Sequence, residues 1–222
     1  MSGRAKAVIA LLVVQLAVTI ASVLVTVVEL GLLQRAQRGE RVTFAEAEAS
    51  DDRVAMVGVV WLVSWLVAGI VWLTWQHRAH RQLRQLGTQG LQFTPGWGVG
   101  WWFVPVANLW KPYQGIKELW VASDPEKGAS DWRGGKAWTV LPWWWAAWLI
   151  SGFLAWGSLG MDPETIDEFI SRDYASIAED LAWVLAGLPA LAIVCGIDRR
   201  LSLISSWAPT RPDLPAPQGD LG

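Results

Sequence analysis

Few side chains in this sequence have the types and spacing that chemistry requires, and the first such group lies near the start of the chain. Gln15, Thr19, Ser22, Thr26 and Glu29 follow one another at steps of four, three, four and three. These steps place all five on one face of an α-helix, which we name the polar seam. A lipid bilayer penalises such a face, so we expect it to point into protein or a wet cavity. It could line a path for a substrate or an ion, or join neighbouring helices by hydrogen bonds.

A basic group follows the second apolar segment of the chain. Arg78, Arg81 and Arg84 are spaced by three residues, so on a helix they project in similar directions. An anionic lipid headgroup or an acidic segment of a partner would suit them, and the simpler alternative is that they only fix the orientation of the helix. His77 and His80 lie in the same stretch. Two histidines without a nearby cysteine or a paired acid make a weak metal site, so we expect no metal.

Residues 95–120 are the most unusual stretch, because tryptophan, glycine and proline are concentrated there. Pro105 removes a backbone donor and interrupts a helix, and the side chain of Asn108 could pair with a carbonyl that is left free. Lys111 and Tyr113 would then lie where lipid headgroups begin. The candidate residues for binding a lipid or another ligand are Arg78, Arg81, Trp101, Trp102, Asn108, Lys111 and Tyr113.

The chain has 18 tryptophans, and most of them lie between residues 97 and 156. Tryptophan prefers the membrane interface, where its ring is buried and its N–H group stays wet, so an aromatic belt is one interpretation. The alternative is a flat aromatic pocket for an isoprenoid, a quinone or a lipid tail beside residues 95–120.

Composition limits the class of protein. Hydrophobic residues make up 53% of the 222 residues and charged residues only 17%, against about 25% charged residues in soluble domains. This excess of apolar residues rules out a disordered chain and argues against a soluble enzyme. The net charge of −2 gives no basis for a nucleic-acid partner. The single cysteine, Cys195, excludes an internal disulfide, and nothing in the sequence predicts a cofactor.

Four apolar runs predict the architecture: residues 7–28, 54–75, 137–160 and 181–197. Because a helix rises 1.5 Å per residue, about 20 residues cross a hydrocarbon layer of ~30 Å. The first three runs are long enough, and the first has no convincing cleavage site, so it is interpreted as an uncleaved signal anchor. The fourth is at the lower limit and contains Pro189, which neighbouring helices can accommodate.

The apolar stretch at residues 95–110 is too short to cross the bilayer and is expected to be re-entrant or interfacial. If it enters and leaves on one side and the N-terminus is inside, 13 of the 18 basic residues are cytoplasmic. The thirteen are Arg4, Lys6, Arg78, Arg81, Arg84, Lys111, Lys117, Lys127, Arg133, Lys136, Arg199, Arg200 and Arg211. If the stretch instead crosses the bilayer, most of the basic residues lie outside. The positive-inside rule therefore favours four spans with both termini in the cytoplasm.

The remaining segments complete one transmembrane domain over residues 1–206. Thr43 and Glu46 have the spacing of a capping box, which predicts a short helix in the first outer loop. Residues 161–180 have the apolar spacing of a surface helix. The proline-rich tail of residues 207–222 is expected to be disordered and cytoplasmic.

The string Gly-Trp…Trp-Trp-Phe…Pro…Asn-Leu…Pro-Tyr…Glu-Leu-Trp in residues 95–120 resembles a family of multi-pass bacterial membrane proteins, domain of unknown function 4328. The resemblance covers roughly residues 54–200. It implies several membrane helices and a plasma-membrane location, and it implies no activity. The positions that carry it are Gly96, Trp97, Gly100, Trp101, Trp102, Pro105, Asn108, Pro112, Tyr113, Glu118 and Trp120.

For function, we expect a non-catalytic protein of the bacterial plasma membrane that acts as an accessory, scaffold or partner-binding component, because no catalytic constellation is present. The alternative is binding or transport of a lipid or another amphipathic small molecule at residues 95–120, with the polar seam facing them. A membrane-embedded enzyme is the third hypothesis. The expected partners are membrane lipids and either another protein or a second copy of this chain.

Overall fold

Apolar sequence with few interruptions forms very long helices in this protein. The computed structural model describes residues 3–127 and 131–207, and the described chain is all-α, as the sequence predicts. Four long helices account for most of it: α1 (Gly3–Gln37), α2 (Phe44–Gln85), α5 (Val140–Leu159) and α6 (Ile166–Trp207). Of the predicted tail, only Trp207 is described, as the last residue of α6, and residues 208–222 lie outside the described residues.

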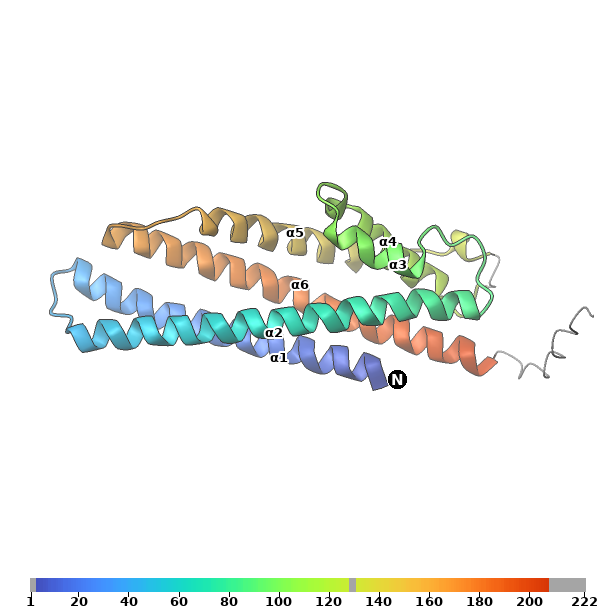
Figure 1. Ribbon diagram of the computed structural model, residues 1–222, viewed down its shortest axis with the longest axis horizontal. Coiled ribbons are helices and arrows are strands. Elements are labelled where there is room, and N and C mark those ends of the chain that lie inside the picture. The colour runs from blue at the N-terminus through green and yellow to red at the C-terminus, as the bar shows by residue number, and fades with distance from the viewer. Residues whose placement is uncertain (1–2, 128–130, 208–222) are drawn as a thin grey trace, which may run out of the picture.

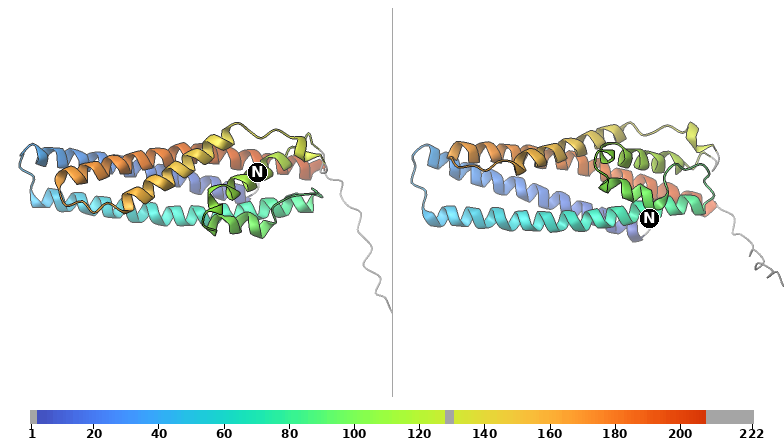
Figure 2. Two further views of the ribbon diagram at one scale, coloured as in Figure 1. Left: turned by 90° about the horizontal axis from the view of Figure 1, so that it is seen from above. Right: turned by 45° about the horizontal axis from the view of Figure 1, so that its top comes forward.

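The long helices alternate in direction along an elongated bundle (Figure 1). α1 packs between α2 and α6, and α6 packs in turn against α5. The α1–α2 and α5–α6 connections lie at one end of the bundle, and the ends of α2 and α6 lie at the other (Figure 2). The basic residues at the end of α2 are therefore far from the acidic loop that precedes α6.

Three of the helices, α1, α2 and α6, are long and apolar enough to cross a membrane. Only 6% of the residues in the most apolar part of α2 are buried inside the protein, so this surface needs an apolar solvent such as lipid. These helices indicate a membrane-spanning protein. Helix α5 coincides with the predicted run at residues 137–160, but its tryptophans lower its hydropathy. Length and composition thus identify three candidate spans, against the four that the sequence predicts.

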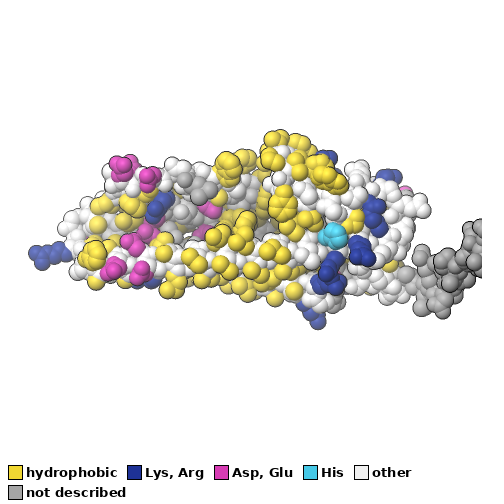
Figure 3. Space-filling model, in the orientation of Figure 1, with side chains coloured by type: hydrophobic (Ala, Val, Ile, Leu, Met, Phe, Trp, Pro, Cys, Tyr) yellow, Lys and Arg dark blue, Asp and Glu magenta, His cyan; other side chains and the backbone are white. Residues whose placement is uncertain are grey.

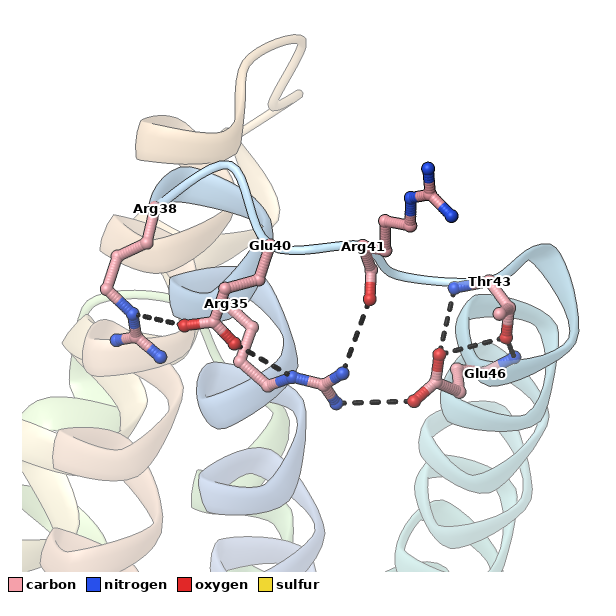
Figure 4. A network of polar contacts seen from close by, with 6 residues as sticks. All are labelled: Arg35, Arg38, Glu40, Arg41, Thr43 and Glu46. Carbon is pink, nitrogen blue, oxygen red and sulfur yellow. Dashed lines mark hydrogen bonds and ion pairs between the residues drawn. The ribbon is translucent and has the colours of Figure 1, made fainter.

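The capping box at Thr43 is present, but the short helix predicted there is the first turn of α2 itself. The backbone N–H of Glu46 donates to the Thr43 hydroxyl at 3.2 Å, and the Thr43 N–H donates to the Glu46 carboxylate at 2.8 Å (Figure 4). Arg35 of α1 also reaches this carboxylate at 3.2 Å. Neither glycine nor proline follows until Gly58, so the helix propagates directly into the apolar run.

The surface helix predicted over residues 161–180 is likewise not a separate element. Helix α6 begins at Ile166 and continues without a break through the apolar run at residues 181–197. Pro189 lies inside this helix, as the sequence analysis allowed. The predicted loop helix and the predicted fourth span are thus one helix of 42 residues.

Between α2 and α5 the chain breaks into short pieces, as its glycines and prolines predict. We name residues 95–122 the broken segment. It consists of α3 (Pro95–Gly100), 3-10 turns at Trp101–Phe103 and Ala107–Leu109, and α4 (Lys111–Ala122). Another 3-10 turn, at Trp132–Gly134, precedes α5. The broken segment lies beside α2, in the half of the bundle where α2 ends and α5 begins (Figure 1).

Helix α4 anchors the broken segment in the core. Ile116 and Leu119 are completely buried. The ring of Trp120 stacks on Trp138, with centroids 4.8 Å apart, and lies against α6 at Gly196. A Cβ atom at Gly196 would lie 2.6 Å from this ring, so only glycine allows the approach. The C-terminal half of the broken segment is therefore held rigidly against the bundle.

Tryptophan rings bridge α2 and α5, which lack the close backbone packing of the other neighbouring long helices. Trp72 of α2 lies 5.9 Å from Trp144 of α5, measured between ring centroids. Trp102 of the broken segment meets Trp148 of α5 edge-on at 5.4 Å. Helices packed directly on one another lie about 8–10 Å apart, and bulky rings hold these two farther apart. A cavity results on this side of the bundle.

Candidate functional site

The cavity between α2 and α5 has a volume of about 530 Å³ and is walled by α1, α2, α5, α6 and the broken segment. This volume lies within the roughly 300–1,000 Å³ that is usual for small-molecule sites. In the space-filling view, the face is hollowed between the two helices, and hydrophobic side chains surround the hollow (Figure 3). The tryptophans that line it are Trp65, Trp72, Trp102, Trp144, Trp148, Trp156 and Trp183.

The first two residues of the polar seam lie in the cavity wall. Gln15 and Thr19 are buried, and both bond to α2. The Ser64 hydroxyl donates to Gln15 Oε1 at 2.6 Å, and the Trp61 indole N–H donates to the Thr19 hydroxyl at 3.1 Å. This part of the seam bonds a neighbouring helix, as one of the two interpretations predicts, and it also faces a cavity.

The other three seam residues follow α1 away from the cavity. Ser22 is half-buried, while Thr26 and Glu29 are buried. The carboxylate of Glu29 lies 3.9 Å from the guanidinium of Arg172 on α6. Ser22, Thr26 and Glu29 lie toward the α1–α2 connection and do not line the cavity.

Four polar atoms of the cavity-lining residues are buried and form no hydrogen bond of good geometry with the described residues. One of them, Trp183 Nε1 of α6, has the carboxylate of Glu179 beside it. The other three are Gln15 Nε2 of α1, Trp72 Nε1 of α2 and Asn108 Oδ1 of the broken segment. Buried polar atoms are nearly always bonded, and leaving one unbonded costs about 1–3 kcal/mol. Two N–H donors and one carbonyl acceptor of these lining residues therefore have no partner among the described residues. A guest molecule that bonded to them would carry an acceptor and a donor on an otherwise apolar body.

The wall that the broken segment contributes is fixed by hydrogen bonds and ring contacts. The Trp102 indole N–H donates to Gln76 Oε1 at 2.8 Å, and the Gln76 amide donates to the carbonyl of Gly98 at 2.8 Å. The Trp145 indole N–H donates to the carbonyl of Leu109 at 2.9 Å. Trp145 also stacks on Trp148, with centroids 4.6 Å apart and planes 12° from parallel. The aromatic wall is thus preorganised.

A strained turn lies between two lining residues of the broken segment, Phe103 and Asn108. Val106 has a φ of 66° and a ψ of −54°, and the N–H of Ala107 donates to the carbonyl of Pro105 at 2.7 Å. This is the strained γ-turn, which is rare for a β-branched residue. Backbone strain of about 1–3 kcal/mol persists where surrounding contacts enforce it, and it gathers at functional sites.

A buried polar cluster below the cavity attaches the broken segment to α2. His80 of α2 is completely buried, and its Nδ1 atom lies 3.1 Å from the carbonyl oxygen of Gln76, so Nδ1 carries the proton. Its Nε2 atom has no hydrogen bond and lies 3.9 Å from Oε1 of Glu118. A Cβ atom at Gly98 would lie 3.0 Å from the imidazole, so glycine permits α3 to cross here.

The two ionisable groups of this cluster have shifted pKa values. Burial lowers the pKa of His80 to about 4, so its ring is neutral near pH 7. Burial raises the pKa of Glu118, against the effect of the backbone N–H groups of Gln92 and Phe93, which donate to its carboxylate at 2.6 and 3.1 Å. The Glu118 carboxylate thus holds Gln92 and Phe93, which lead into α3, against α4.

Sequence reasoning missed Gln76 altogether and considered His80 only as a metal ligand. The signal for both was a polar residue continuing the buried face of α2 beyond its apolar run. Within the described residues, no group of three His, Cys, Asp or Glu side chains is arranged to hold a metal ion. His77 lies half-buried in a groove, apart from the buried His80.

The predicted ligand-binding residues fall into three places. Trp102 and Asn108 line the cavity. Arg78 and Arg81 line an adjoining groove. The other three pack on rings of the broken segment and of α5 and line neither: the Lys111 ammonium lies 5.6 Å from the ring of Trp101, and Tyr113 contacts Trp145 at 6.3 Å.

Comparison with known proteins identifies the family and nothing closer. No curated protein and no solved structure matches the chain. The family model described as Domain of unknown function (DUF4328) matches residues 38–199, which includes α2, the broken segment, α5 and most of α6. The cavity wall outside this match is α1. The match confirms the resemblance seen in the broken segment, and the chain belongs to the DUF4328 family.

Proposed function

We propose that this protein binds an amphipathic small molecule in the tryptophan-lined cavity, within the plasma membrane of a bacterium. The observation that carries the proposal is that three unpartnered polar atoms belong to residues that line one apolar cavity. Gln15, Trp72 and Asn108 come from three different elements, and each has a buried polar atom that no described residue satisfies. Three buried polar atoms without hydrogen bonds, all in residues that line one cavity, are better explained by a bound molecule than by chance.

The chemistry of the cavity defines the class of guest. Flat tryptophan walls favour an aromatic or isoprenoid body, and the two N–H donors favour a carbonyl or hydroxyl oxygen. A quinone or a hydroxylated isoprenoid has both features. The lining residues include no acid and no base, and the one hydroxyl among them, that of Thr19, is bonded to Trp61. Binding or movement of the molecule is therefore the proposed role rather than catalysis.

The proposed membrane topology has four crossings, with both termini in the cytoplasm. The apolar surface of α1, α2 and α6 supports three crossings, and α5, antiparallel to α6 along the same bundle, is proposed as the fourth. The broken segment is proposed to dip into the bilayer from the cytoplasmic side and return to it. The position of its two ends in the same half of the bundle supports this, as does the charge bias of the sequence.

A role in binding another protein or a second copy of the chain is the other candidate. The observation that favours it is the bare outer face of α2, where Gly58 is exposed and a Cβ atom at this position would meet nothing within 4 Å. Small residues on exposed membrane helices permit close helix–helix approach. This role does not account for the polar atoms inside the cavity, so small-molecule binding is the preferred function.

The test fills the cavity without removing a polar group. Gly69 lines the cavity and has open space at its Cβ position, so Gly69→Leu should occupy part of the volume without a clash. Gly58→Leu is the matched control, because Gly58 is on the same helix, is equally open and lies outside the cavity. Each protein is purified in mild detergent, and retained small molecules are identified by native mass spectrometry.

A short-chain quinone serves as a direct probe, because it should quench the fluorescence of the surrounding tryptophans. We expect saturable quenching in the wild type and in Gly58→Leu, and quenching weakened at least tenfold in Gly69→Leu. Gln15→Leu combined with Asn108→Leu should also weaken quinone binding, by about 1–3 kcal/mol. If the wild type retains no small molecule and the quinone quenches all variants equally, the proposed function is wrong.

A further inference from the structure

A second hollow, of about 1090 Å³, lies where the start of α1, the end of α2 and the end of α6 meet. It is lined on α2 by Ile70 and Leu73 and then, farther along the same helix, by Arg78 and Arg81. Because a helix rises 1.5 Å per residue, the lining changes from apolar to cationic over about 16 Å along α2. We name this hollow the basic groove, and it has the polarity profile of a phospholipid.

Three arginines from two helices line the basic groove. Arg4 projects from the first turn of α1, and Arg78 and Arg81 come from α2. None of the three forms an ion pair or a hydrogen bond with another described residue, and no lining residue carries a carboxylate. Lys and Arg side chains gather around a histidine beside the hydrophobic surface at this end of the bundle (Figure 3).

Other arginines of the chain are used differently, which sets these three apart. Arg84 donates to the carbonyl of Phe93 at 2.8 Å, and Arg200 donates to the carbonyl of Trp120 at 2.8 Å. Those side chains hold the fold together. Arg4, Arg78 and Arg81 have no such contact with the described residues and are available to an anion.

We propose that the basic groove binds the phosphate group of an anionic phospholipid from the cytoplasmic leaflet. Arg78 and Arg81 are three residues apart and lie on one side of α2, so both can reach one phosphate, and Arg4 closes the site from α1. Guanidinium groups suit phosphate because their planar N–H groups bond two oxygens at once. The half-buried His77 lies in the same wall.

The apolar part of the groove distinguishes a lipid from a soluble phosphate compound. Ile70 is 64% exposed and Phe103 is 71% exposed, and both line the groove below the arginines. A soluble anion would leave these side chains uncovered, whereas the acyl chains of a lipid would cover them. The tryptophan-lined cavity shares Leu73 and Phe103 with the groove, but this proposal does not depend on an occupant there.

The test measures which lipids the protein retains from nanodiscs of phosphatidylcholine with a minority of phosphatidylglycerol. Native mass spectrometry counts the two lipids on the wild type and on Arg78→Gln combined with Arg81→Gln. The matched control is Arg41→Gln combined with Arg53→Gln, which removes the same charge from exposed positions at the opposite end of the bundle. Inorganic phosphate is added in a parallel arm as a soluble competitor.

We expect the wild type and the control to be enriched in phosphatidylglycerol. The Arg78 and Arg81 variant should lose that preference by roughly 30-fold, because each arginine near an anionic lipid strengthens its binding roughly fivefold. Inorganic phosphate should not displace the lipid. The proposal is overturned if the variant keeps the preference, if the control loses it equally, or if inorganic phosphate displaces it. Should the double variant not fold, Arg78→Gln and Arg81→Gln are measured singly against Arg53→Gln, and each must weaken retention.

Discussion

The Nε2 atom of His80 lies 3.9 Å from Oε1 of Glu118, yet the two side chains form no ion pair at neutral pH because the imidazole is uncharged. Histidine in an unfolded chain has a pKa near 6.5, whereas burial holds the pKa of His80 in the folded protein at about 4. Between these values the unfolded chain binds a proton that the folded protein does not. The free energy of unfolding therefore falls as pH is lowered from 6.5 to 4, by about 3 kcal/mol at most.

The measurement is the melting temperature in mild detergent between pH 4 and pH 8, for the wild type and for His80→Gln. The raised pKa of Glu118 acts in the opposite sense, because it favours the folded protein at low pH, but this contribution is shared by both proteins. The difference between wild type and variant should hence be constant above pH 6.5 and change below it. Parallel curves over the whole range would show that His80 does not titrate as inferred.

Gln76→Leu should destabilise the broken segment. The substitution removes the amide that bonds Trp102 and the carbonyl of Gly98, and it leaves both groups buried without partners. The expected cost is about 2–4 kcal/mol in the free energy of unfolding. Gln114→Leu on the exposed side of α4 is the control and should change little. Equal melting temperatures for the two variants would contradict the bridging role of Gln76.

Val106→Gly should stabilise the protein, unlike most glycine substitutions. Val106 has a positive φ of 66°, which glycine adopts without steric cost. We expect a gain of about 1 kcal/mol after the greater flexibility of the unfolded chain is subtracted. Val104→Gly, at a φ of −90°, should instead lose about the same amount. The melting temperatures of the two variants are compared with that of the wild type. A lower melting temperature for both variants would mean that the turn is not strained.

Gly196→Ala should loosen the contact between α6 and α4. The added methyl group would lie 2.6 Å from the ring of Trp120, which is held by Trp138 and by Arg200. Overpacking of this kind costs about 1–3 kcal/mol. Gly152→Ala on α5 meets open space and should be neutral or stabilising, since alanine is the better helix former. The order of the two melting temperatures is the readout, and a more stable Gly196→Ala would refute the packing inferred for α4.

Labelling from outside the cell tests the proposed four-crossing topology. In a chain with Cys195 replaced by alanine, Lys127→Cys precedes α5, and Ile170→Cys lies near the start of α6. We expect a membrane-impermeant maleimide to label only position 170 in intact cells, and to label both positions after the membrane is opened. Labelling of position 127 in intact cells would contradict this topology, because either the broken segment would cross the bilayer completely or the whole bundle would be inverted. Inversion would also place the basic groove outside the cell.

The helices could be predicted because each is a local consequence of composition. The apolar runs at residues 7–28 and 54–75 fall inside α1 and α2, and glycines and prolines interrupt the chain where the sequence places them. Helix lengths were underestimated at the α1–α2 and α5–α6 end. Polar residues there have adequate helix propensity, and a helix that has already nucleated in an apolar run extends through them at little cost.

The candidate site was predictable only in part. The spacing of Gln15 and Thr19 predicts that they face inward, and the unusual composition of residues 95–120 marks the segment that meets them. Nothing local links either one to Trp72, or links His80 to Glu118. His80 and Glu118 lie 38 positions apart, so their contact exists only when α4 folds back against α2.

The sequence by itself determined an all-α chain with apolar helices, an inward polar face on α1 and membership of one family, because composition, periodicity and motif spacing act along the chain. Only the tertiary structure decided that α2 and α5 stand apart and are bridged by tryptophan rings. A ring can fill a gap, stack on a neighbour or lie in lipid at similar cost, so its partner is set by the packing of whole helices. The cavity is the space left by that packing, and no single stretch of sequence encodes it.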